Sequence, residues 1–304
     1  MVLLALACAA VLISTAALAV VIADAARARL IVYGVCLIAS LALFSIALLA
    51  LLGISYDPLA ATLPLGIPWL GAHFRLDALS AFFLAVVNLG AAAASLFALG
   101  YGRHEDAPRW VLPFYPAFLA GMSIVVLADD AFTFLVSWEF MSLSSWALVM
   151  AHHRVSDNVR AGYVYLIMAS FGTLALLLTF GLLAGPDGGY AFVDIRGGHP
   201  SAALAASILI LALIGAGSKA GLVPLHVWLP LAHPAAPSHV SALMSGVMTK
   251  VAVYGFVRIV FDLIGTPAWW WSMVVLALGG ISGDGRALRT DATRPQAAAR
   301  VPHG

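Results

Sequence analysis

Lysine and glutamate are nearly absent from this sequence, which has only two of each in 304 residues. Charged residues make up 10% of the chain and hydrophobic residues 63%. A typical soluble domain has about 25% charged residues, so this composition excludes an ordinary water-soluble protein. The formal net charge of +1 gives no sign of a nucleic-acid partner, and we expect none.

Residues that bind cofactors are also scarce. The two cysteines, Cys8 and Cys36, lie in apolar stretches, and there is no CxxC motif, cysteine cluster or Gly-rich nucleotide fingerprint. His226, His233 and His239 have no cysteine and no acidic neighbour in the segment between them, which argues against a metal site. We therefore predict no cofactor and no metal in this chain, so that any iron-sulfur, flavin or nickel chemistry belongs to partners.

Long uncharged runs, by contrast, are abundant, as in residues 30–54 and 161–185. Each run exceeds the ~20 residues that a helix needs to cross ~30 Å of hydrocarbon. The sequence therefore predicts an all-α, polytopic transmembrane helical bundle of about nine spans. Their expected positions are residues 2–23, 30–54, 78–102, 110–128, 131–151, 161–185, 202–232, 238–261 and 266–281.

The arginines predict how the bundle is oriented. The first run has no basic start and is longer than the apolar part of a signal peptide, so we expect it to be a retained helix. Because arginine-rich loops stay in the cytoplasm, we predict that the N-terminus is outside and that residues 55–77 form an ordered connection on the outer face. The loops after spans one, three and five carry Arg27, Arg29, Arg103, Arg109, Arg154 and Arg160, whereas those after spans two, four and six carry Arg75 and Arg196.

Three ionisable residues lie within predicted spans: Glu139, Lys219 and Lys250. Each costs roughly 2.5 to 3.5 kcal/mol at bilayer depth, so such residues are rarely present without a partner or a function. Their spread over three helices favours an ion or proton path. Glu139 is near the middle of span five, and Ser142, nearly one turn later, shares its face. The alternative for Glu139 is a permanently protonated carboxyl that is hydrogen-bonded to a neighbouring serine.

Lys219 lies in a glycine-rich stretch, residues 215–226, that also contains Pro224. Because this proline cannot donate to the carbonyl of Ala220, we predict a broken helix in span seven, just beyond the lysine. Broken helices at membrane depth line hydrated cavities, and transporters place ion sites there. The lysine is also the natural cation for Glu139. A kinked packing helix with a snorkelling lysine is the alternative, and the apolar residues on both sides disfavour it.

Further titratable groups follow Lys219 along the chain. His239 precedes Lys250 by eleven residues, and at ~100° per residue this spacing returns to within about 20° of the same helix face. We expect His226, His239 and Lys250 to continue a line of titratable groups away from Lys219. For each histidine alone, a hydrogen-bonded structural role is at least as strongly indicated as proton transfer.

Several of these motifs resemble one known family. The chain resembles the antiporter-like proton-pumping membrane subunits of the respiratory complex I superfamily in four places. These are residues 224–230, residues 232–248 with the segment from Lys250 to Arg258, the pair Trp138-Glu139, and residues 217–221. Within this superfamily, the chain is most similar to the branch of hydrogenase-4 component B and formate hydrogenlyase subunit 3. The resemblance covers roughly residues 70 to 280.

The resemblance implies a fold of about fourteen helices with two inverted five-helix repeats. It implies that Glu139 pairs with the broken-helix residue Lys219, that Lys250 is the next relay residue, and that His226 connects them. It also implies membrane and peripheral partner subunits that carry iron-sulfur, nickel-iron or flavin centres, and a multi-pass location in the bacterial inner membrane.

The final residues depart from the family. Residues 283–304 are polar, arginine-rich and contain a proline, so we expect no span there but a disordered or frameshift-derived tail of a truncated chain. The expected organisation is residues 1–109 as three helices with an outer loop, 110–262 as a five-helix repeat, 263–282 as a ninth span and 283–304 as the tail.

The sequence thus predicts a proton-translocating membrane subunit, without redox centres of its own, of a complex like hydrogenase-4 or NADH-quinone oxidoreductase. One alternative is a component of a multisubunit sodium/proton antiporter, which shares the fold and motifs. Another is a non-pumping truncated scaffold. A retinal-type protein with a Schiff-base lysine is a weaker rival, since it needs one linked lysine and this chain has two on neighbouring helices.

Overall fold

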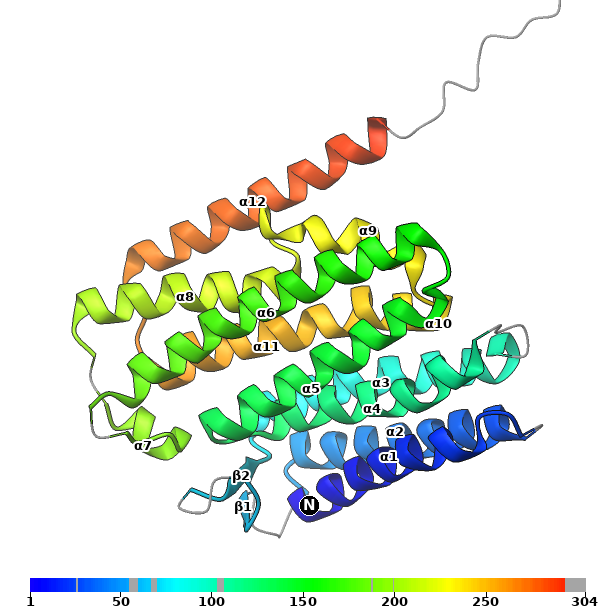
Figure 1. Ribbon diagram of the computed structural model, residues 1–304. Helices are drawn as coiled ribbons and strands as arrows, with labels where there is room; N and C mark the ends of the chain where they lie inside the picture. Colours follow the sequence, from blue (N-terminus) through cyan, green and yellow to red (C-terminus); the bar gives the residue numbers. More distant parts are fainter. Residues whose placement is uncertain are drawn as a thin grey trace, which may run out of the picture.

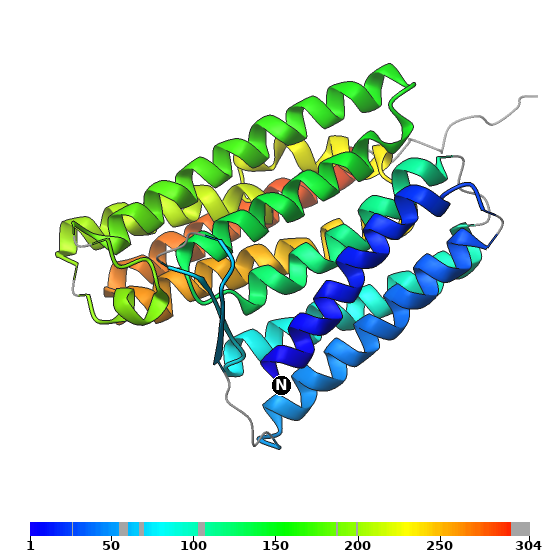
Figure 2. The same ribbon diagram turned by 60° about the horizontal axis from the view of Figure 1, so that its bottom comes forward.

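A computed structural model describes residues 1–292, apart from residues 26, 55–59, 67–69, 103–106, 187 and 199. It is a bundle of long helices that run side by side (Figures 1 and 2). Within the described residues, eight helical segments are long and apolar enough to cross a membrane, which confirms the polytopic helical bundle. They comprise α1 (Val2–Ile22), α2 (Ala28–Leu51), α3 (Ala78–Tyr101), α4 (Pro108–Leu127), α5 (Ala131–Val149), α6 (Ser156–Ala184), α8 (Ala202–Ala220) continued by α9 (Leu229–Ala235), and α10 (Ser238–Leu243) continued by α11 (Thr249–Val257).

The expected ninth span is shorter than predicted. Helix α12 (Trp269–Ala292) has an apolar part of only 14 residues, Trp269–Ser282, which is less than the ~20 residues that a span needs. Residues 283–292 continue this helix, so the first part of the polar tail is helical where the sequence predicted disorder. The remainder of the tail, residues 293–304, lies outside the described residues.

A small extramembrane layer covers one end of the bundle. Strands β1 (Ala60–Leu63) and β2 (Ala72–Arg75) pair as an antiparallel hairpin, which the sequence did not predict. The short helix α7 (Phe192–Arg196) and the N-terminus lie at the same end (Figure 1). Thus part of the predicted ordered connection at residues 55–77 is the hairpin, while residues 55–59 and 67–69 lie outside the described residues.

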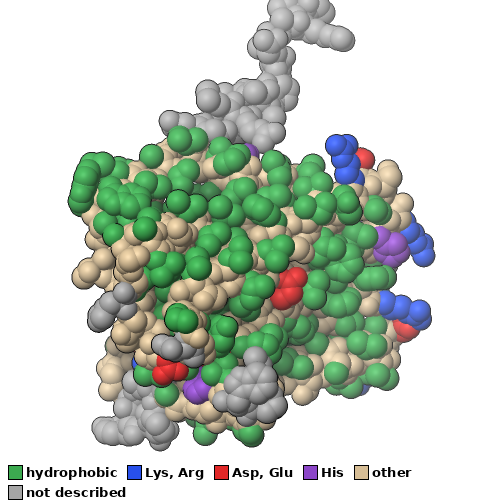
Figure 3. Space-filling model, turned by 60° about the vertical axis from the view of Figure 1, so that its left-hand side comes forward, with side chains coloured by type: hydrophobic (Ala, Val, Ile, Leu, Met, Phe, Trp, Pro, Cys, Tyr) green, Lys and Arg blue, Asp and Glu red, His purple; other side chains and the backbone are tan. Residues whose placement is uncertain are grey.

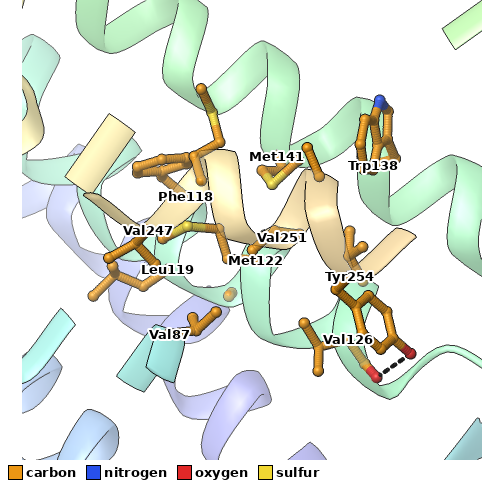
Figure 4. Packing of buried hydrophobic residues seen from close by; sticks show 14 of the residues in the cluster. Val87, Phe118, Leu119, Met122, Val126, Trp138, Met141, Val247, Val251 and Tyr254 are labelled. Carbon is orange, nitrogen blue, oxygen red and sulfur yellow. Dashed lines mark hydrogen bonds between the residues drawn. The ribbon is translucent and has the colours of Figure 1, made fainter. Parts of the chain in front are cut away.

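Helix α4 is the most enclosed span, and it packs against α5 and α11 through a core of large side chains (Figure 4). Phe118 and Met122 of α4 and Met141 of α5 belong to one buried hydrophobic cluster. The close contact depends on Gly121, because a Cβ there would lie 2.9 Å from the Cα of Met141. This contact fixes α5, and with it Glu139, against the centre of the bundle.

The predicted break in span seven is confirmed, but it begins earlier than its proline. Helix α8 ends at Ala220, and Gly221 adopts a left-handed conformation (φ 78°) as its C-cap. The N–H of Leu222 then donates to the carbonyl of Gly217 over 2.9 Å. A short 3₁₀ turn, Leu225–Trp228, leads into α9. The helix is therefore terminated by glycine, with Pro224 preventing its resumption.

Span eight contains two wide helical turns that the sequence did not predict. Residues Met244–Met248 and Arg258–Leu263 have π-helical geometry, on either side of α11. Each π turn inserts one residue into the α-helical repeat, so the side chains that follow are rotated by about 100° relative to an uninterrupted helix.

Candidate functional site

Lys219 is the centre of the site. It lies in the last turn of α8, and only 2% of its surface is exposed. Its Nζ donates to Ser142 Oγ of α5 over 2.7 Å and to Tyr165 OH of α6 over 2.9 Å. The same nitrogen lies 4.8 Å from the centre of the Tyr165 ring, within cation–π range. An amine in an apolar bundle is thus surrounded by neutral oxygens and one aromatic face.

The hydroxyls around Lys219 donate their own hydrogen bonds to other oxygens, away from the lysine. Ser142 Oγ donates to the carbonyl of Trp138 over 2.8 Å, which leaves its lone pairs for the lysine. The Tyr165 and Ser145 hydroxyls lie 2.6 Å apart, and Ser145 also donates to the carbonyl of Met141 over 2.8 Å. Because each hydroxyl has an acceptor for its proton, the group accepts hydrogen bonds from a charged lysine without leaving a donor unpaired.

Glu139 is partly buried midway along α5, and its partner is a hydroxyl. Thr173 Oγ1 of α6 donates to Glu139 Oε2 over 2.6 Å. Glu139 and Lys219 do not approach within 4.0 Å as an ion pair. The neighbouring serine that the sequence offered, Ser142, donates to a backbone carbonyl. The carboxyl's actual partner, on another helix, was not predicted. Figure 3 shows that the face of the bundle turned to the viewer is largely hydrophobic, with few acidic side chains on it.

Close packing of α6 on α8 fixes the lysine near Tyr165. A Cβ at Gly172 would lie 2.2 Å from Ser218 Oγ, and a Cβ at Gly215 would lie 2.6 Å from Leu176 Cγ and 3.0 Å from the carbonyl oxygen of Gly172. Only glycine permits this approach of two membrane helices. On the far side of the break, Trp228 Nε1 donates to the carbonyl of Ser218 over 2.7 Å, so the end of α8 is fastened to the 3₁₀ turn.

His239 and Lys250, two members of the predicted line, lie in different surroundings. His239 is 1% exposed and its ring packs among Tyr33, Tyr101 and Tyr115, with centroids 5.5, 6.1 and 5.2 Å away. Lys250, by contrast, is exposed, with its Nζ 3.3 Å from Thr249 Oγ1.

The expectation that His239 and Lys250 share a face is wrong, because the π turn at Met244–Met248 lies between them. His226 is partly buried in the 3₁₀ turn beyond Lys219, and its Nδ1 has no hydrogen-bond partner in the part of the chain that the structure describes. The position of His226 near the break agrees with the sequence, whereas its connection to Lys250 remains a prediction.

An ion-pair network at the hairpin end was missed altogether. Arg258, 3% exposed, donates from both terminal nitrogens to Asp77, over 2.6 and 2.8 Å, and also to Asp262 over 2.9 Å. Arg196 of α7 binds Asp262 over 2.9 and 2.7 Å and reaches Asp129 at 3.3 Å. Three arginines and three aspartates thus form one continuous series of ion pairs, in which each residue contacts the next: Arg75, Asp129, Arg196, Asp262, Arg258, Asp77.

This network joins α3, the hairpin, the α4–α5 turn, α7 and the end of span eight. Asp77 is also the N-cap of α3, where it accepts from the N–H of Ser80 over 2.8 Å. Burial by itself would raise the pKa of Asp77, but its hydrogen bonds and charge interaction with Arg258 lower the pKa to about 2. The only signal in the sequence was the presence of Arg258 and Asp262 inside an apolar run, i and i+4 apart, which predicts a pair on one helix face.

Among the described residues, no group of three or more His, Cys, Asp or Glu side chains is arranged to hold a metal ion. The site of Lys219 is formed by neutral hydroxyls, which suit a proton-carrying amine better than a metal or a nucleotide.

The chain also matches known proteins. Residues 128–283 match the model of the family NADH:quinone oxidoreductase/Mrp antiporter, TM. Hydrogenase-4 component B of Escherichia coli (strain K12) is 41% identical over 213 residues, which are 68% of this chain and 31% of that protein. A component of a probable K(+)/H(+) antiporter of Rhizobium meliloti (strain 1021) is 32% identical over 225 residues, 71% of this chain and 22% of that protein.

The fold has solved counterparts as well. A chain in the structure of the Mrp complex from Dietzia sp. DQ12-45-1b superposes with a TM-score of 0.72 at 24% identity, covering 90% of this chain and 30% of that one. The present chain therefore spans about a third or less of the proteins it matches here. The family match covers more than half of the chain and contains Glu139, Lys219 and the broken helix. The chain thus belongs to the NADH:quinone oxidoreductase/Mrp antiporter transmembrane family.

Proposed function

We propose that this chain is the proton-translocating part of one membrane component in a multisubunit redox complex of the hydrogenase-4 or NADH-quinone oxidoreductase type. The observation that carries the proposal is Lys219: an amine that is 2% exposed, lies at the end of a broken membrane helix, and among the described residues is hydrogen-bonded only to hydroxyls. Such a site holds a proton without a permanent counter-ion, so a change in nearby charge can load or release it.

The proposed path has Lys219 as its central carrier. Glu139 supplies a movable negative charge, because its present partner is a single threonine hydroxyl. His226, whose Nδ1 is unpaired, lies beyond the break and takes the proton onward, and Lys250 receives it on span eight. We assign His239 a structural role, since three tyrosines enclose it.

The electron-transfer chemistry is proposed to belong to other subunits, with iron-sulfur, nickel-iron or flavin centres. Hydrogenase-4 component B, 41% identical, supports a hydrogenase-type complex. We further propose a bacterial inner membrane with the N-terminus, the hairpin and α7 on the outer side, as the arginine distribution favours.

The test uses inverted membrane vesicles from cells that carry the full chain within its complex. Redox-driven acidification is followed with a pH-sensitive dye, for the wild type, for Lys219→Ala and for Arg109→Met, an exposed arginine that serves as the matched control. We expect Lys219→Ala to abolish acidification at normal protein level, while electron transfer continues and the control remains active. Normal acidification by Lys219→Ala would contradict the proposal.

A second candidate is a component of a cation/proton antiporter, which the 32% identity to the K(+)/H(+) antiporter component favours. The same vesicles distinguish the two. Proton movement that requires added Na⁺ or K⁺ and no electron donor would select the antiporter, whereas movement that requires the donor would select the redox complex.

A further inference from the structure

Helix α6 presents a hydroxyl to each of the two ionisable groups at the site. Tyr165 OH accepts from Lys219 Nζ, and Thr173 Oγ1, two turns later, donates to Glu139 Oε2. The lysine's other partner, Ser142, is three residues after Glu139 on α5, so their side chains lie on adjacent turns of one helix face. Helices α5 and α6 thus bring the carboxyl and the amine into one site, where each is bound to a neutral hydroxyl instead of to the other.

Thr173 has two acceptors for one proton. Its Oγ1 lies 2.6 Å from Glu139 Oε2 and 3.1 Å from the carbonyl oxygen of Ala169, one turn earlier on α6. A hydroxyl carries a single hydrogen, so it donates to one of these oxygens at a time. When the carboxyl leaves, the hydroxyl turns to its own helix, and no donor is left unpaired. The release of Glu139 therefore costs little free energy in hydrogen bonds of Thr173.

We propose that Thr173 is a positioning residue that competes with Lys219 for the Glu139 carboxylate and so sets how often the two charges meet. In the arrangement seen here, the threonine holds Glu139 and the pair is open. When the hydroxyl turns to Ala169, Glu139 is free to approach Lys219 and the pair closes. This inference rests on the proposed function, because it assigns the control of the same proton-carrying site.

The chain offers a matched set of variants for the test. Thr173→Val keeps the branched shape but removes the donor, and Thr173→Ser keeps the donor. Thr179→Val is the control, since Thr179 also lies on α6 and is fully buried, but it donates only to the carbonyl of Ala175, over 2.8 Å. None of these residues carries the translocated proton.

The first readout is infrared spectroscopy of the purified chain in lipid, with the carboxyl band of Glu139 identified by its loss in Glu139→Gln. A hydrogen bond to a charged group is strong enough that its loss changes an equilibrium by about tenfold, which is one pH unit. We expect Thr173→Val to change the position of the Glu139 carboxyl band, because the hydroxyl that donates to this carboxyl is gone. Thr173→Ser and Thr179→Val should match the wild type.

The second readout is the pH profile of acidification in the vesicles. Thr173→Val should favour the closed pair, in which a nearby carboxylate retains the lysine proton, and so shift the half-maximal rate about one pH unit higher. If the carboxyl band and the pH profile of Thr173→Val overlie those of the wild type, or if Thr179→Val shifts them equally, the inference is refuted.

The two proposals fail separately. Loss of acidification in Lys219→Ala, with no shift in Thr173→Val, would refute the role of Thr173 and leave the proposed function intact. Normal acidification in Lys219→Ala, with a shifted Glu139 band in Thr173→Val, would refute the proposed function while supporting the contact between Thr173 and Glu139.

Discussion

Removal of Arg258 should be one of the most destabilising single changes at the hairpin end of the bundle. The side chain is almost fully buried and makes three hydrogen bonds to two carboxylates, Asp77 and Asp262. The change Arg258→Met keeps an unbranched, largely apolar stem but removes the guanidinium group. It leaves Asp77 with the N–H of Ser80 as its main remaining donor, while Asp262 retains Arg196.

The loss of stability in Arg258→Met depends on how far the Arg258–Asp77 ion pair is shielded from water. Loss of one member of a buried ion pair costs about 3 to 5 kcal/mol. The Asp77 side chain is 29% exposed, so water reaches the stranded carboxylate and the lower end of that range, about 3 kcal/mol, is expected for Arg258→Met. The second change, Asp77→Asn, removes the stranded charge. The double variant should therefore be more stable than Arg258→Met alone.

The measurement is equilibrium unfolding of the purified chain in mixed micelles, by titration with a denaturing detergent. Arg109→Met is the control, because its pair with Asp24 is exposed, at 74% and 63% of the side chains, and should contribute nothing measurable. Equal unfolding midpoints for Arg258→Met and Arg109→Met, or additive effects of Arg258→Met and Asp77→Asn, would refute the reasoning.

Three further predictions concern other parts of the molecule. Since an arginine partner lowers the pKa of Asp77 to about 2, its contribution is present above about pH 4 and is lost as pH falls toward 2; the unfolding midpoint should drop there, and less so in Asp77→Asn. Gly215→Ala, whose new Cβ would lie 3.0 Å from an α6 carbonyl oxygen, should lower the midpoint, whereas Gly181→Ala, with open space around it, should not. In a cysteine-free background, a cysteine at Ser201 should react with an impermeant thiol reagent in intact cells and one at Ser156 should not; the reverse labelling would invert the predicted orientation.

The membrane spans were the most predictable part of this molecule. A backbone in lipid must form its hydrogen bonds internally, so a long apolar run in a membrane is predicted to be a helix. The break in span seven was predicted from Pro224, although Gly221 ends the helix. The buried position of Lys219 also agrees with its place in the sequence. These features depend on local composition, so the sequence alone was sufficient.

Contacts between distant segments were not predictable in this way. Nothing local pairs Thr173 with Glu139, and Arg258 and Asp77 are 181 residues apart. The direct pairing of Glu139 with Lys219 was expected from their charges and from the family resemblance, whereas in the structure each group is hydrogen-bonded to hydroxyls. The failed alignment of His239 with Lys250 has another cause, since a π turn has no composition that marks it.

That π turn determines which side chains beyond it meet the bundle interior. Because Met244–Met248 contains one residue more than an α-helical turn would, the direction of Lys250 depends on the number of residues in this segment and not only on their identity. If a relative lacks one residue here and has a regular α-helical turn in place of the π turn, its lysine would point in the same direction as Lys250. Alignments of span eight should therefore permit a gap within the helix, because a gapless match would equate side chains that point in different directions.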